Sequence, residues 1–85
     1  MRKFEVGQIF KYSDYQKCCI VAYGESDNTY LIAIEEFSGH DGSLNVVSRR
    51  KAFDIIRHCG LKGVSERPFW FFQDYNLEEL EEVKR

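Results

Sequence analysis

The sequence predicts an α+β fold in which an antiparallel sheet of four to five strands packs against one amphipathic helix, with a short helix at the C-terminal end. Three observations predict it. Apolar and aromatic runs alternate with turn-forming residues in the first half, the hydrophobic period becomes helical after Ser48, and an aromatic run returns at 69–72. The 85 residues are expected to form one globular domain, 1–85, because a domain usually takes about 100–200 residues.

Three strands are expected in the first half of the chain. Residues 6–12 are rich in β-branched and aromatic side chains and end at a Ser-Asp turn. Residues 17–23 are almost continuously apolar, which is typical of a strand covered on both faces. A five-residue turn separates this run from 29–37, so the two runs are expected to form an antiparallel hairpin. A further short strand is expected at 44–47.

The central helix is expected at 49–59. Its apolar residues recur at helical spacing on one side, and Ser48 is a suitable N-cap. Gly60 is expected to end the helix as a left-handed C-cap.

Pro68 and the aromatic run 69–72 predict a strand, with the proline at its start where no ladder donor is lost. Because side chains alternate along a strand, Phe69 and Phe71 are expected on one face, and Trp70 and Phe72 on the other.

The tail is expected to form a short helix. Asn76 and Glu79 have the spacing of a variant capping box, and an apolar stripe follows at Leu77, Leu80 and Val83.

The opening of the chain, Val6-Gly7-Gln8-Ile9-Phe10 followed by two long strands, resembles the opening of SH3-like small β-barrels. The resemblance covers about residues 4–48 and implies a small barrel-like sheet. It favours binding over catalysis, as a likeness of fold alone.

Composition excludes several classes of protein. The chain is 44% hydrophobic and 15% aromatic with a net charge of −2, which excludes intrinsic disorder. No apolar run approaches the roughly 18 residues of a membrane span, and the N-terminus lacks the features of a signal peptide. Three cysteines cannot form a closed set of disulfides, so a reducing compartment is expected. These observations predict a soluble, cytoplasmic protein.

No pattern in the sequence indicates an enzyme, a cofactor or a metal. Cys18, Cys19 and Cys59 are expected to be small buried hydrophobes. The pairs Cys18-Cys19 and His58-Cys59 are adjacent, whereas zinc ligands are normally two to four residues apart. Asp54 is spaced for a surface ion pair with Arg50, and the adjacent Glu35 and Glu36 are expected to point to opposite faces.

Two charged surfaces and one aromatic residue are candidates for binding a partner. Residues 49–67 contain six Lys/Arg against two Asp/Glu, a local charge of +4. Its cationic candidates are Arg49, Arg50, Lys51, Arg57, Lys62 and Arg67. The acidic tail contributes Glu78, Glu79 and Glu82, and Trp70 is a candidate anchor.

The sequence therefore favours a small non-enzymatic protein-interaction module whose partner is another protein. Its size and mildly acidic composition are those of host-directed inhibitors from phages or mobile elements. The alternative is a nucleic-acid-binding domain that uses the basic segment 49–67. No membrane partner is expected, and the oligomeric state is left open.

Overall fold

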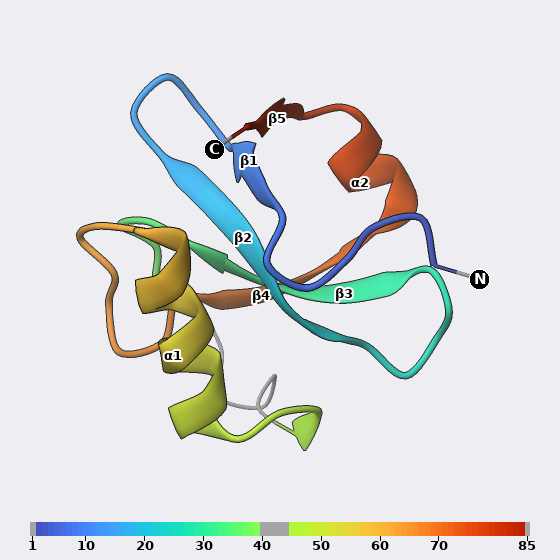
Figure 1. The fold of residues 1–85 in the computed structure, drawn as a ribbon, viewed down its shortest axis with the longest axis horizontal. Helices are drawn as coiled ribbons and strands as arrows, with labels where there is room; N and C mark the ends of the chain where they lie inside the picture. The colour runs from blue at the N-terminus through green and yellow to red at the C-terminus, as the bar shows by residue number, and fades with distance from the viewer. Residues whose placement is uncertain (1, 40–44, 85) are drawn as a thin grey trace.

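A computed structural model describes residues 2–39 and 45–84 (Figure 1). In these ranges the elements are β1 (Ile9–Lys11), β2 (Lys17–Tyr23), β3 (Thr29–Ile34), α1 (Arg49–Cys59), β4 (Phe69–Gln73), α2 (Asp74–Glu78) and β5 (Glu81–Val83). The strands form one antiparallel sheet in the order β4-β3-β2-β1-β5. The predicted α+β class is confirmed, with five strands, one long helix and one short helix among the described residues.

Apolar side chains cover both faces of the sheet. Cys18 and Cys19 are adjacent on β2 and lie in different clusters, as alternation along a strand requires. The α1-side cluster contains Ile9, Cys19, Val21, Ala22, Leu31, Ala33, Ala52, Ile56 and Phe69. The α2-side cluster contains Phe10, Cys18, Ile20, Tyr30, Ile32, Ile34 and Leu77. Figure 1 shows why two clusters form, since α1 and α2 lie at opposite ends of the view with the sheet between them.

The predicted helix at 49–59 is confirmed together with both of its caps. Ser48 accepts a hydrogen bond from the backbone N–H of Lys51 at 3.2 Å. Gly60 has φ +78 and donates its N–H to the carbonyls of Ile56 and Arg57, both at 3.1 Å. These contacts are all local, which is why the sequence alone located both ends.

The strands of the first half are shorter than predicted. β1 begins at Ile9 rather than at residue 6, because Gly7 has φ +97 and the segment before it turns. β3 ends at Ile34 rather than at 37, because Glu36 has φ +53 and donates its N–H to the Gly63 carbonyl instead of continuing the strand. The strand expected at 44–47 is absent from residues 45–47, and residue 44 lies outside the described residues.

The predicted short C-terminal helix is present as α2, but its cap and its end differ from the prediction. The N–H of Gln73 donates to Asn76 Oδ1 at 2.8 Å, so Asn76 caps α2 from within its first turn, and the predicted Asn76–Glu79 capping box is wrong. The helix ends at Glu78, and residues 81–83 form β5 against β1, with Phe10 opposite Glu82. Leu80 packs on the α2-side cluster and Val83 on the α1-side cluster, a division that helical spacing does not allow.

The barrel implied by the SH3-like resemblance is not confirmed. Strand pairing in the described residues runs in one series from β4 to β5, and no pairing joins these two edge strands. None of the described helices is long and apolar enough to cross a membrane.

A candidate interaction surface around strand β4

Four aromatic rings form two contacting pairs on the α2 side of the sheet, Tyr12 with Phe72 and Phe37 with Trp70, which we call the aromatic row. Trp70 packs edge-on against Phe37 with ring centroids 5.9 Å apart, and Phe72 lies 6.1 Å from Tyr12. Phe37 and Phe72 pack against the α2-side cluster, whereas Trp70 and Tyr12 are 42% and 39% exposed. Trp70 and Tyr12 are therefore exposed to solvent, and each contacts a ring that packs on the α2-side cluster.

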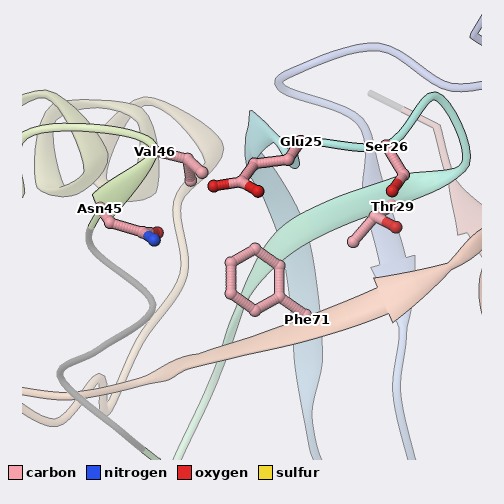
Figure 2. Close-up of a pocket in the computed structure, with 6 residues that line it drawn as sticks. All are labelled: Glu25, Ser26, Thr29, Asn45, Val46 and Phe71. Atoms are coloured by element: carbon pink, nitrogen blue, oxygen red, sulfur yellow. The ribbon is translucent and has the colours of Figure 1, made fainter.

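The opposite face of β4 carries a third exposed aromatic residue, Phe71, at 38% exposure. It belongs to an open cavity of about 290 Å³, which we call the Phe71 pocket (Figure 2). Its described lining residues are Glu25, Ser26, Thr29, Asn45, Val46 and Phe71.

The turn that forms one wall of the Phe71 pocket is held by several hydrogen bonds. The Arg2 guanidinium donates to the carbonyls of Gly24 and Thr29 at 2.8 and 2.7 Å. Asn28 Nδ2 donates to Gln73 Oε1 at 3.1 Å and ties the turn to the end of β4. The wall is therefore fixed relative to Phe71.

β4 is an edge strand with aromatic side chains exposed on both faces. Trp70 lies opposite Ile32 and Phe71 opposite Leu31 in the pairing with β3. Large apolar side chains exposed together at a sheet edge mark a surface suited to contact another molecule. The predicted alternation along 69–72 is confirmed, since Phe69 lies in the α1-side cluster and Phe72 packs on the α2-side cluster.

The cationic candidates of 49–67 are distributed over several environments. Arg49 donates to the Glu66 carbonyl and stacks over the Phe53 ring, with its guanidinium carbon 5.0 Å from the centroid. Arg57 forms an ion pair with Asp54, so Asp54 pairs with Arg57 instead of the expected Arg50. All six cationic candidates are exposed, and Arg50, Lys51, Lys62 and Arg67 are the four other than Arg49 and Arg57. Since successive helix positions differ by about 100°, Arg50 and Lys51 lie on different strips of α1.

The acidic candidates are also partly used within the chain. Glu78 forms an ion pair with Lys3, and Glu82 accepts from Gln8 Nε2 at 3.2 Å and lies 3.7 Å from Lys84 Nζ. Glu79 is exposed. Glu78 therefore joins the N-terminal segment to α2, and Glu82 joins the residue before β1 to β5.

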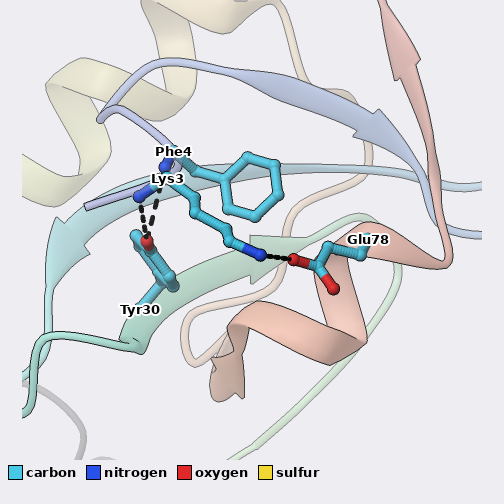
Figure 3. Close-up of polar contacts among 4 residues, drawn as sticks. All are labelled: Lys3, Phe4, Tyr30 and Glu78. Atoms are coloured by element: carbon cyan, nitrogen blue, oxygen red, sulfur yellow. Dashed lines mark hydrogen bonds and ion pairs between the residues drawn. The ribbon is translucent and has the colours of Figure 1, made fainter. Parts of the chain in front are cut away.

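Figure 3 shows how the N-terminal segment is held over α2 and β3. The backbone N–H groups of Lys3 and Phe4 donate to the Tyr30 hydroxyl at 3.2 and 3.3 Å, and Lys3 Nζ reaches Glu78. The Phe4 ring packs edge-on against Tyr30 at 5.8 Å. Burial, followed by the neighbouring Asp74 carboxylate, raises the pKa of Tyr30 above its ordinary value, so this hydroxyl acts as a neutral structural partner.

The thiols lie in structural positions. Burial raises the pKa of Cys18 to about 12, which leaves it protonated and unreactive at neutral pH. Cys59 is half-buried, with Sγ 3.5 Å from the Gly7 carbonyl oxygen. Within 2–39 and 45–84, no group of three or more His, Cys, Asp or Glu is placed to hold a metal ion.

Sequence reasoning missed Glu25, Phe71 as a pocket residue, and the role of Glu35. Glu35 is buried at 8% exposure, and its carboxylate accepts from the N–H groups of Lys17 and Lys62 at 2.8 and 2.7 Å. No local pattern in the sequence signals the pocket or the role of Glu35, because the residues involved come from separate segments.

Comparisons with protein-family models, with curated proteins and with solved structures found no match.

Proposed function

We propose that this chain is a non-enzymatic protein-interaction module that docks through the surface around β4. The observation that carries the proposal is the exposure of Trp70 and Tyr12 on the aromatic row, above ring contacts that hold the row in place. Tryptophan and tyrosine are enriched among the residues that dominate protein interfaces, because they bury a large area with few rotatable bonds. Binding to a partner through this surface would be sufficient for an inhibitory role.

The nucleic-acid alternative has weaker support. Phosphate binding requires several cations that act together, and each contact makes affinity depend steeply on salt. Here Arg49 is tied to the Glu66 carbonyl and Arg57 to Asp54. Nucleic-acid binding is therefore the alternative that the nuclease treatment in the capture experiment below detects.

The test is affinity capture from lysate with tagged wild-type chain, Trp70→Ala and Tyr15→Ala, each with and without nuclease. Tyr15 is the matched control because it is an aromatic residue at 89% exposure on the β1–β2 turn. We expect a defined protein that survives nuclease, with affinity at least about tenfold weaker for Trp70→Ala and unchanged for Tyr15→Ala.

Thermal unfolding followed by circular dichroism establishes that Trp70→Ala still folds cooperatively. Trp70→Thr, which removes the ring and keeps a residue suited to a strand, serves as a second variant if the alanine variant does not fold. Retention of the partner by a folded Trp70 variant contradicts the proposal, and so does capture that disappears with nuclease.

A further inference from the structure

We propose that the Phe71 pocket receives an arginine side chain of the partner. This inference rests on the proposed function and names the chemistry that a partner must offer beside β4. It follows from the shape of the pocket, the charge of its wall and the rigidity of its frame.

The charge of the pocket selects a cation. Figure 2 shows Glu25 and Asn45 pointing toward one another across the space beside the Phe71 ring. Glu25 belongs to none of the ion pairs found among the described residues, so its carboxylate is available to an incoming group. Glu25 is exposed, so an anionic group placed there would be repelled by its charge, and an apolar group would make no favourable contact with it.

The remaining lining residues suit a planar cation with several donors. Ser26 and Thr29 line the other end of the pocket, where the Thr29 hydroxyl lies 3.5 Å from Asn28 Oδ1, and Asn45 adds a side-chain amide. A guanidinium presents five N–H donors in one plane and stacks on aromatic faces, whereas an ammonium is a compact and strongly hydrated point charge. The exposed Phe71 ring beside the Glu25 carboxylate and the Asn45 amide therefore favours arginine over lysine.

The size of the pocket favours one side chain over a free metabolite. Its volume of about 290 Å³ is at the lower limit of the roughly 300–1,000 Å³ typical of small-molecule sites, and it is open to solvent. An arginine side chain delivered by a protein already held on the aromatic row needs only to fill this open space.

The frame of the pocket is prepared for such a ligand. Thr29 donates its N–H to the Ser26 carbonyl at 3.1 Å, and Gly24 donates to the Thr29 carbonyl at 2.8 Å. With the Arg2 and Asn28 contacts described above, these bonds hold the β2–β3 turn before any ligand arrives. A fixed turn lowers the entropic cost of binding.

The test uses N-acetyl-arginine amide as a probe, titrated into the ¹⁵N-labelled full chain and followed by backbone amide shifts. N-acetyl-citrulline amide is the uncharged isostere, and N-acetyl-lysine amide carries the same charge in another shape. We expect saturable shifts centred on residues 25–29, 45–46 and 71 with the arginine probe, weaker ones with lysine and none with citrulline.

Three variants separate the pocket from general electrostatics. Glu25→Gln should weaken the arginine probe by about tenfold, because bonds to a charged group are replaced by neutral ones. Phe71→Leu should weaken it by about two- to fivefold, the value of a cation–π contact at an exposed site. Asp27→Asn removes an equal charge from the same turn without lining the pocket and should change affinity by less than about twofold.

Equal shifts with citrulline overturn the inference, as do shifts away from the pocket or equal losses in Glu25→Gln and Asp27→Asn. The failure of the inference can be told from the failure of the proposed function. A partner that depends on Trp70 but binds Glu25→Gln normally overturns the arginine site and leaves the function standing. If the arginine probe binds in a Glu25-dependent way but partner capture does not depend on Trp70, the proposed function is overturned and the arginine site is supported.

Discussion

Replacing Glu35 by glutamine should destabilise the fold far more than the same change at its neighbour. The Glu35 carboxylate is buried, and its two oxygens each accept one backbone N–H, from Lys17 at the start of β2 and from Lys62 after α1. Its own N–H donates to the Lys17 carbonyl at 3.0 Å. One side chain therefore joins the sheet to the segment that follows the helix.

The expected loss follows from these two bonds. A hydrogen bond to a charged group contributes about 1.5–3 kcal/mol, and a buried donor left without an acceptor costs about 1–3 kcal/mol. Glutamine keeps one acceptor oxygen, now neutral, and turns its NH₂ group toward the other N–H. We expect the free energy of unfolding to fall by about 2–4 kcal/mol. That is a large part of the roughly 4–13 kcal/mol expected for a domain of this size.

The assay is urea denaturation followed by the fluorescence of Trp70, the single tryptophan of the chain. Glu36→Gln is the matched control, since it removes the same charge at the adjacent, exposed position. If the two variants unfold within about 0.5 kcal/mol of each other, which is the usual range for surface changes, the structural role given to Glu35 is wrong.

Two further predictions concern the buried thiol and a close backbone contact. Burial raises the pKa of Cys18 from 9.0 to about 12, so the folded chain keeps a proton that the unfolded chain loses above about pH 9. The stabilisation that comes from the protonated Cys18 thiol is therefore fully present below pH 9. Above that pH, the free energy of unfolding declines by about 1.4 kcal/mol per pH unit as the pH rises toward 12. Urea midpoints measured from pH 8 to 10.5 should therefore fall less steeply for Cys18→Ala than for wild type, and equal slopes would contradict this assignment. Gly39→Ala should lower stability by about 1–3 kcal/mol, because the new Cβ would overlap the Phe69 carbonyl oxygen and lie 2.9 Å from a Phe37 ring carbon. An unchanged melting temperature for this variant would show that the segment moves aside at no cost.

Helix α1 shows what local pattern can establish. Its start depends on Ser48 and Lys51, three residues apart, and its end depends on the left-handed conformation that Gly60 adopts without strain. The alternation of faces along β4 is equally local, because it follows from the pleat of any strand. Both were predictable for this reason.

The tail shows the opposite case. Its glutamates and the spacing of Leu77, Leu80 and Val83 favour a helix when only near neighbours are considered. In the structure β1 offers an unpaired edge, and residues 81–83 pair with it from the other end of the chain. The hydrogen bonds and the separate burial of Leu80 and Val83 outweigh a weak helical preference.

The sequence by itself determined the α+β class, the central helix with its caps and the sides on which the β4 aromatics lie, because periodicity and capping act over a few residues. The tertiary structure decided which polar groups are used within the chain and which aromatic surfaces remain exposed. Glu78 meets Lys3 across 75 positions of sequence, and the described lining residues of the Phe71 pocket come from three separate segments. Such contacts form only when the sheet brings distant segments together, and the candidate site depends on them.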